Sequence, residues 1–495
     1  MTETVSPFVK RRAGVLLHIT SLPESPGNGD LGPQAYRFVD FIQAAGLSVW
    51  QVLPHGPTHE DLSPYQCLSA HAGNPLWISL ELLQQQGWLQ QTEVAPALSI
   101  EDIADYRHQC LVEARKGFEE KSQEEDRNNY EQFLQNTSRW LDDFSLYSAL
   151  RQEHVGRNWL DWPQLERDRV PDAIQAARSR LSGTINQVKF EQFMFYQQWM
   201  ALKRYANSRG ILMFGDFPVY VAHDSADVWV DRRQFDLDKN GNPNAVAGVP
   251  PDYFSDTGQL WGNPQYNWEQ MLADDFVWWK QRIHSNLELY DLIRVDHFRG
   301  FESYWSIQGN AQSASEGEWR TAPGRVLFES LEKEFGQLPL VAEDLGIITS
   351  EVDALRQSAR LPGMKVLQFA FDGGPDNPYL PHNHERLSVV YTGTHDNDTT
   401  LGWYNGLPGD KKQRIANYLN EPAVPMPWLF INTALSSVCR LAMIPLQDFL
   451  ELGTDQRMNV PATKEGNWRW RFREGLLTAE LAEKIKRLVV LYGRG

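Results

Sequence analysis

Eight short runs of apolar residues recur along the chain, separated by stretches with helical periodicity. Apolar runs that are too short for a helix are typical of parallel strands buried on both faces. The runs are Ala13–Ile19, Ser48–Pro54, Ile211–Phe217, Leu292–His297, Pro339–Asp344, Met364–Phe369, Leu387–Thr392 and Leu441–Leu446. Strands that alternate with helices in this number predict an α/β fold, a (β/α)₈ TIM barrel.

Many of these runs end in an acidic residue. Asp216, Asp296 and Glu343 close three of them, Asp396 lies just past a fourth, and Asp448 follows the last. The catalytic face of a (β/α)₈ barrel is the one at the carboxyl ends of its strands. Each acid taken alone has an ordinary alternative as a surface charge or salt-bridge partner, so only their joint arrangement predicts an active site.

The spacing of the runs indicates one catalytic barrel over residues 1–495 with three insertions. The first, at about 62–200, is mainly helical because apolar residues fall on one helical face. The second, at about 219–287, is rich in loops and aromatic residues, and long loops in a compact domain are usually functional. We expect it to cover the substrate. A smaller insertion is expected at about 305–335.

Composition narrows the class of ligand. The net charge is −17 and no dense Lys/Arg stripe is present, which argues against binding to nucleic acid or an anionic membrane. The 18 Trp residues suit either a large core or stacking on the apolar faces of sugars. A neutral, sugar-like ligand fits these values better than a charged one.

Cysteine usage and hydropathy predict a cytoplasmic protein. Cys67, Cys110 and Cys439 are few, odd in number and widely separated, so they indicate neither a disulfide framework nor a zinc site. The first twelve residues contain no apolar signal core, and nowhere do 18 apolar residues follow one another. We therefore expect neither secretion nor a membrane span.

Two motifs imitate cofactor sites. Residues 27–32 fit the Gly-x-Gly-x-x-Gly pattern of dinucleotide binding, but Pro23 and Pro26 separate them from the preceding strand and the next strand lacks the acid that would bind a ribose. Asp236 opens a calcium-like loop whose twelfth position is Ala247 instead of Glu. We interpret the first as a loop over the barrel mouth and the second, with Asn240-Gly241, as a hairpin turn. No metal site is expected.

Two strand ends carry the chemistry of glycosidic bond cleavage. Strand alternation places Arg294 and Asp296 on one side, where the guanidinium favours an ionised carboxylate suited to attack an anomeric carbon. Glu343 ends the next strand near Asp296, Asp344 and Asp396, whose negative charge should raise the pKa of Glu343. A carboxylate and a protonated carboxyl on adjacent strands are the pair that a retaining glycosidase mechanism requires.

These residues lie in stretches that resemble the signature regions of the α-amylase clan and, within it, the 4-α-glucanotransferases of glycoside hydrolase family 77. The clan-like stretches are Gly215-Asp216-Phe-Pro218-Val, Arg294-Val-Asp296-His297, Ala342-Glu343-Asp344-Leu-Gly346 and Gly393-Thr-His395-Asp396. Stretches that resemble the family itself are Trp50-Gln-Val-Leu-Pro54, Ser63-Pro-Tyr65, Ala72-Gly-Asn74-Pro75, Val249-Pro-Pro-Asp252-Tyr-Phe-Ser255, Gly258-Gln-Leu-Trp261-Gly-Asn263-Pro264 and Arg457-Met-Asn459. The similarity runs from about residue 11 to the C-terminus.

The resemblance implies a role for each matching residue. Asp296 would be the nucleophile, Glu343 the acid and base, and Asp396 the transition-state stabiliser. Substrate-binding and supporting residues would be Tyr65, Asp216, Asp252, Phe254, Trp261, Asn263, Arg294, His297 and His395. The family fold is a barrel without the C-terminal β-sandwich of ordinary amylases, and its members need no cofactor.

The implied activity is transfer of an α-1,4-glucan segment to the 4-hydroxyl of another glucan or of glucose, with retention of configuration and possible closure to cycloamylose. The partners would be maltooligosaccharides, amylose, starch or glycogen, and a monomer is the simplest expectation. A hydrolase with the same residues and a non-catalytic glucan-binding protein are the alternatives. The chain departs from the family pattern at His55, His59–Leu62, His384 and Ala462.

Overall fold

The computed structural model describes residues 7–23, 27–90, 100–251, 257–421, 423–463 and 465–495. Its centre is a sheet of eight parallel strands in the order β10-β11-β12-β1-β2-β3-β6-β9. The strands are β1 (Arg12–Leu16), β2 (Val49–Gln51), β3 (Leu212–Phe217), β6 (Leu292–Val295), β9 (Leu340–Ala342), β10 (Gly363–Val366), β11 (Ser388–Tyr391) and β12 (Leu441–Pro445). Every apolar run of the sequence overlaps one of these strands, and the barrel prediction is confirmed.

The two end strands of this sheet meet and close the barrel. The Ala342 N–H at the end of β9 donates to the carbonyl of Pro362, next to β10, at 2.9 Å. Asp344 supports the same junction because its carboxylate accepts the Met364 N–H at 2.6 Å. The interior is packed with side chains from all parts of the sheet, such as Val49, Phe214 and Met443, as expected of a barrel of this size.

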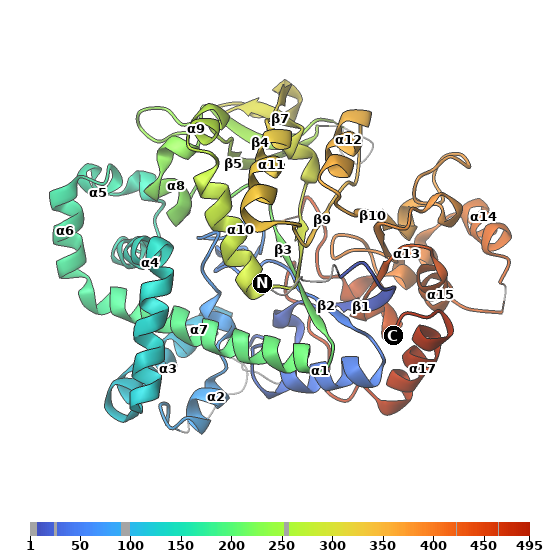
Figure 1. Cartoon of the computed structure of the whole chain (residues 1–495), viewed down its shortest axis with the longest axis horizontal. Helices are drawn as coiled ribbons and strands as arrows, with labels where there is room; N and C mark the ends of the chain where they lie inside the picture. Colours follow the sequence, from blue (N-terminus) through green and yellow to red (C-terminus); the bar gives the residue numbers. More distant parts are fainter. Residues whose placement is uncertain (1–6, 24–26, 91–99, 252–256, 422, 464) are drawn as a thin grey trace.

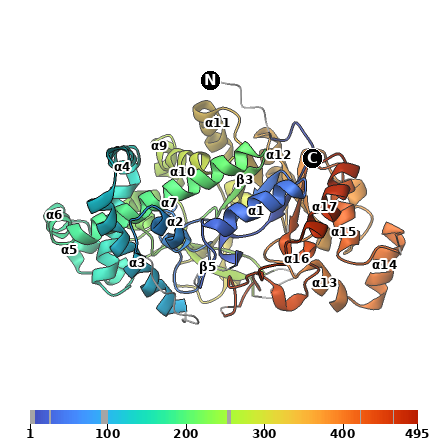
Figure 2. The same ribbon diagram turned by 90° about the horizontal axis from the view of Figure 1, so that it is seen from below.

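Helices surround the barrel in Figures 1 and 2. Those that follow or flank the strands are α1 (Pro33–Ala44), α7 (Ser182–Ser208), α10 (Val277–Leu289), α11 (Gly324–Phe335), α12 (Ser350–Ser358), α13 (Thr400–Gly406), α14 (Gly409–Leu419), α15 (Trp428–Ser436), α16 (Leu446–Phe449) and α17 (Ala479–Leu491). No described helix has the length and apolar character needed to cross a membrane.

A helical lobe leaves the barrel between β2 and β3 and extends to one side, on the left of Figure 1. It contains α2 (Leu80–Gln85), α3 (Ile100–Lys121), α4 (Glu124–Glu153), α5 (Gln164–Arg167), α6 (Pro171–Arg180) and the first part of α7. Leu141, Phe144, Tyr147 and Leu150 of α4, each three residues after the one before, are buried. This apolar stripe packs α4 against the rest of the lobe.

A second, antiparallel sheet lies at the top of Figure 1, in the order β5-β4-β7-β8. Its strands are β4 (Ala245–Val249), β5 (Gln259–Pro264), β7 (Ser303–Gln308) and β8 (Glu318–Thr321), with α8 (Ala226–Val230) and α9 (Trp268–Ala273) beside them. The predicted turn at Asn240-Gly241 is present, because Leu237 and Pro243 form an antiparallel bridge. However, β4 pairs with β5 and β7 and does not pair across that turn.

Candidate active site

Arg294 is the centre of a buried ion network at the carboxyl end of the barrel. It lies directly opposite Asp216 in the register of β6 and β3. Its Nη1 donates to both oxygens of Asp216, at 2.9 and 2.7 Å, and its Nη2 donates to Asp296 Oδ1 at 2.7 Å. The guanidinium therefore fixes two carboxylates from neighbouring strands in one arrangement.

Burial and charge act in opposite directions within this network. Burial disfavours the Arg294 cation, yet Asp216 and Asp296 together raise the pKa of Arg294 well above its usual value. Burial of Asp216, whose side chain is 0% exposed, raises the pKa of that carboxyl to about 6 although Arg294 acts against the shift. Removing either Arg294 or one of its carboxylate partners would leave a buried charge without compensation, which is costly.

Glu343 follows β9, and the pairing of Val295 with Ala342 puts it beside Asp296. Its two oxygens accept the backbone N–H groups of His297, at 2.7 Å, and Leu345, at 2.9 Å. Burial raises the pKa of Glu343 to about 7, with the charge of Asp296 adding to the shift and Arg294 opposing it. A carboxyl with this pKa can give and take a proton near neutral pH.

Asp344 does not contribute to the site in the way the sequence predicted. Charges on Asp296, Asp344 and Asp396 were expected to raise the pKa of Glu343; the main cause is burial, and Asp296 adds to the shift as expected. Asp344 is turned toward β10, where its carboxylate accepts the Met364 N–H and lies 3.4 Å from Arg356 Nε. The prediction for Asp344 was wrong because consecutive residues of a strand end point to opposite sides.

His297 adopts a strained backbone conformation next to the two acids. Its φ is +50°, in the left-handed region that L-residues seldom occupy. This conformation directs its N–H at Glu343. Burial lowers the pKa of the His297 imidazole to about 4, and the ring meets Trp261 of β5 edge to face at 4.9 Å. His297 thus links Glu343 to the aromatic side chain of Trp261.

Tyr65, His395 and Asp396 form a second wall of the site, next to Asp216. The Tyr65 hydroxyl donates to Asp216 at 2.9 Å, and its ring stacks on His395 with centroids 5.2 Å apart. His395 Nε2 lies 3.3 Å from Asp396 Oδ2. The Asp396 side chain is 47% exposed and so remains open to a ligand. Although burial acts the other way, His395 and Asn459 hold the pKa of Asp396 well below its usual range.

A segment far along the chain completes this wall. Asn459 Nδ2 donates to Asp396 Oδ1 at 2.7 Å, and Arg457 Nη2 donates to the Asp396 carbonyl at 2.9 Å. Trp468 lies 6.0 Å from the His395 ring. The sequence motifs contained Arg457 and Asn459 but gave no reason to place them in the site. Trp468 was missed, and its φ of +64° was not visible in the sequence.

The remaining predicted binding residues differ in position. Trp261 faces His297, as described above. Asn263 is buried, accepts from Gln66 at 3.0 Å and donates to the carbonyl of Val221 at 2.8 Å, so it holds the segment next to Tyr65. Asp252 and Phe254 lie outside the described residues.

Asp448 holds together the two ends of the loop that carries Asp396. Its carboxylate accepts the hydroxyls of Thr392 and Thr400, both at 2.6 Å, and the Thr400 N–H at 2.8 Å. Thr392 and Thr400 flank the loop on either side. This strand-end acid is therefore used for structure, which is the ordinary alternative considered for each of them.

The departures from the family pattern lie in different environments. His55 is buried, and its Nδ1 is 2.9 Å from the hydroxyl of Tyr290. His384 contacts Ser437 Oγ at 2.8 Å and the Tyr379 carbonyl at 2.9 Å, before β11 and β12 begin and away from the acids. Leu62 and Ala462 both have positive φ, at +62° and +64°.

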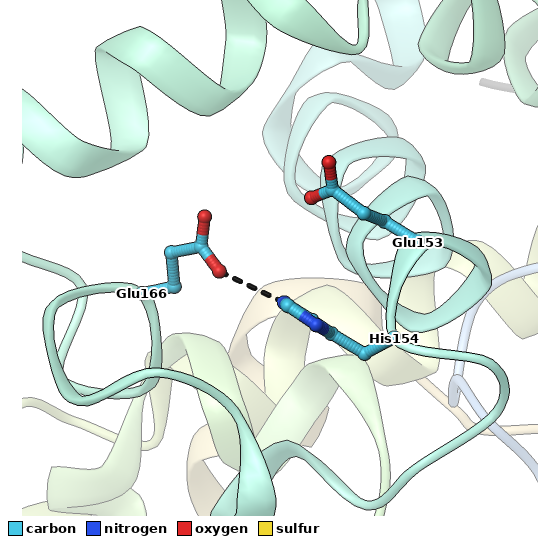
Figure 3. Close-up of side chains that lie close together, drawn as sticks. All are labelled: Glu153, His154 and Glu166. Carbon is cyan, nitrogen blue, oxygen red and sulfur yellow. Dashed lines mark hydrogen bonds and ion pairs between the residues drawn. The ribbon is translucent and has the colours of Figure 1, made fainter.

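One group in the described part of the chain has the composition of a metal site, and it lies in the helical lobe. Side-chain atoms of Glu153, His154 and Glu166 lie within 4.8 Å of one another (Figure 3). His154 contacts Glu166 at 2.8 Å, and Arg180 donates to both glutamates at 2.7 to 2.9 Å. Because the Arg180 guanidinium already donates to both carboxylates, the group serves to join α4, α5 and α6.

Comparison with known proteins identifies the family. A family model described as 4-alpha-glucanotransferase matches residues 17–478. The chain belongs to this family. The resemblance drawn from its motifs is confirmed, and the chain is an enzyme of the glycosyl-transferring class.

Relatives of the family agree over the full length. A 4-alpha-glucanotransferase from Synechocystis is 46% identical over 98% of both chains, and one from Thermus thermophilus is 45% identical over 96% of this chain and 97% of its own. An amylomaltase from Streptococcus agalactiae, solved with acarbose, superposes with a TM-score of 0.94 at 38% identity over 98% of this chain and 100% of its own. The amylomaltase of Corynebacterium glutamicum shares the fold, with a TM-score of 0.77 at 19% identity over 99% of this chain and 76% of its own.

Proposed function

We propose that the enzyme transfers a segment of an α-1,4-glucan to the 4-hydroxyl of another glucan or of glucose, with Asp296 as nucleophile and Glu343 as acid and base. The observation that carries this proposal is the contrast between two adjacent carboxyls. Asp296 is held by a guanidinium at 2.7 Å, whereas burial keeps a proton on Glu343 near neutral pH. A carboxylate paired with a guanidinium, next to a carboxyl that can hold a proton near neutral pH, is the arrangement that a retaining reaction needs for its nucleophile and its acid.

In the first step, the Glu343 proton moves to the glycosidic oxygen while an Asp296 oxygen attacks the anomeric carbon. The carbon–oxygen bond of the glycoside breaks, the fragment with the reducing end leaves as an alcohol, and a glycosyl ester on Asp296 remains. In the second step, the acceptor 4-hydroxyl gives its proton to Glu343 and attacks the same carbon. The ester bond breaks, Asp296 leaves as a carboxylate, and two inversions give overall retention.

Asp396 has the role of stabilising the transition state. Its half-exposed carboxylate can accept hydrogen bonds from the hydroxyls of the sugar that reacts. Such bonds strengthen as the ring distorts and positive charge develops at the anomeric carbon. Tyr65 and His395 would hold the same sugar, since their stacked rings adjoin both Asp216 and Asp396.

The covalent step is tested with an activated donor, a glycosyl fluoride whose leaving group needs no protonation. Glu343→Gln should still form the ester, and without a base for the acceptor it should accumulate as an adduct seen by intact-protein mass spectrometry. Asp296→Asn should give no adduct. An adduct on Asp296→Asn, or turnover near that of the parent, would show that another residue is the nucleophile.

Maltotriose distinguishes transfer from hydrolysis. A transferase converts it to glucose and a ladder of longer oligomers at a nearly constant number of reducing ends. A steady rise in reducing ends would identify a hydrolase with the same residues, and the absence of any product would support a non-catalytic glucan-binding protein.

The proposed site of action is the cytoplasm. The three cysteines form no disulfide, which fits a reducing compartment. Recovery of the enzyme with the secreted proteins after cell fractionation would oppose this location.

A further inference from the structure

An exposed tryptophan stands beside the loop that carries Glu343. Trp319 lies on β8, the edge strand of the second sheet, and is 40% exposed. Its ring meets Trp305 at 5.2 Å, and the Arg299 guanidinium covers it at 3.8 Å from the ring centroid. The indole is thus held on two sides while a large part of it faces solvent. Large aromatic side chains in such positions serve as contact surfaces for ligands.

Arg299 connects this ring to the active site. It follows Asp296 by three residues and is buried, and its Nη1 donates to the carbonyl of Ile347. Ile347 follows Glu343 by four residues, and its side chain is 59% exposed. Four residues of chain span at most about 14 Å, so the backbone of Ile347 lies within that distance of the backbone of Glu343. We call these two side chains the Trp319 ledge.

The position of the ledge decides which part of the glucan it would meet. In the proposed reaction Glu343 protonates the oxygen that joins the donor sugar to the leaving sugar, so the leaving and accepting chains lie on the Glu343 side of the donor sugar. The ledge is joined to the segment that follows Glu343 through Arg299, whereas Tyr65, His395 and Asp396 belong to other loops. The ledge is therefore assigned to the accepting chain.

We propose that the Trp319 ledge binds the distal part of an acceptor α-1,4-glucan and makes the enzyme favour long acceptors over glucose. This inference rests on the proposed function, because it takes Glu343 as the acid that separates donor from acceptor. The exposed ring would stack on the apolar C–H face of a glucose unit, and Ile347 would extend the contact. Arg299 is a positioning residue that keeps the ring in place.

The test measures acceptor preference in the full-length enzyme. The donor is an α-maltosyl fluoride blocked at its non-reducing 4-hydroxyl, so that it can donate and cannot accept. The acceptors are glucose and maltoheptaose. The quantity compared is the kcat/KM for maltoheptaose divided by the kcat/KM for glucose. Trp319→Ala should lower this ratio about two- to tenfold through the KM of maltoheptaose, the size of an aromatic stacking contact. Trp319→Phe, which keeps a flat ring, should lower it less.

Two further variants keep the result interpretable. Ile347→Ser changes a side chain that is mostly in solvent and should lower the ratio without disturbing folding. Tyr418→Ala is the matched control, because Tyr418 is 37% exposed but lies on α14, on the other side of the barrel in Figure 1, and its ratio should equal that of the parent.

The outcomes separate the two proposals. An unchanged ratio in both Trp319→Ala and Ile347→Ser, or an equal loss with both acceptors, would overturn the ledge while leaving the transfer reaction intact. A parent enzyme that transfers to no acceptor at all would overturn the proposed function and the ledge with it.

Discussion

Replacing Arg294 with Met tests whether the buried ion network is as costly to break as its geometry indicates. The substitution keeps most of the side-chain volume and removes three hydrogen bonds, two to Asp216 and one to Asp296. Asp216 then retains the Tyr65 hydroxyl at 2.9 Å as a partner and stays fully buried. Leaving a buried charge without its partner destabilises a protein by about 3–5 kcal/mol.

A second route to the magnitude uses protonation. Without Arg294 the buried Asp216 carboxyl becomes neutral by taking up a proton. At pH 7, against an unfolded-state pKa of about 3.9, this proton costs about 4 kcal/mol in the variant and about 3 kcal/mol in the parent, where the Asp216 pKa is about 6. At pH 5 the carboxyl is protonated in both proteins, and the cost is about 1.5 kcal/mol in each. The sign follows from the raised folded-state pKa: the unfolded chain binds fewer protons, so stability falls as pH rises. The variant should therefore lose more stability at pH 7 than at pH 5.

The assay is the midpoint of thermal unfolding of parent and variant at both pH values, followed by far-ultraviolet circular dichroism. The double variant Arg294→Met with Asp216→Asn is the control, because a neutral amide cannot be left as an unpaired charge. It should recover part of the loss at pH 7. An equal loss at both pH values, or a double variant no more stable than the single one at pH 7, would refute the electrostatic account.

Three other changes have defined outcomes. Glu343 must hold a proton, and burial raises its pKa to about 7, so kcat/KM for transfer should fall as the pH rises through about 7. A kcat/KM that stays unchanged up to pH 9 would contradict this. Asn459→Ala removes the amide that donates to Asp396 Oδ1, so the carboxylate is held less firmly and kcat for transfer should fall about tenfold, the size of one hydrogen bond to a charged group; an unchanged kcat would contradict a role of Asn459 in positioning Asp396. Ala462→Gly removes the strain of an alanine in the left-handed region, and the greater entropy of the unfolded chain offsets part of this gain. The free energy of unfolding should rise by about 0.5–1 kcal/mol, seen as a higher midpoint of thermal unfolding, and a lower midpoint would contradict this.

The barrel strands were predictable because they are buried on both faces and therefore stand out as apolar runs. β7 and β8 were not predicted, and β8 shows why: all four of its residues are exposed, so no hydrophobic alternation marks it. The second sheet forms by pairing residues that are distant in sequence, such as Ala245 with Gln308. Such pairing leaves no local signal.

The site was predictable where its contacts lie within one strand. Strand alternation put Arg294 beside Asp296, two residues away. The link from Arg294 to Asp216 depends on the register between β6 and β3, which no local pattern gives. The cause of the raised Glu343 pKa was misjudged for a similar reason, because burial is a property of the assembled fold.

The hold of Asn459 on Asp396 has a consequence for synthesis of the chain. All three acids have been translated by residue 396, but the amide that holds the last of them is added 63 residues later. A chain emerging from the ribosome therefore carries every charged group of the proposed reaction before Asp396 is held in place. Glucan turnover should begin only when the last part of the sequence has folded back onto the barrel mouth.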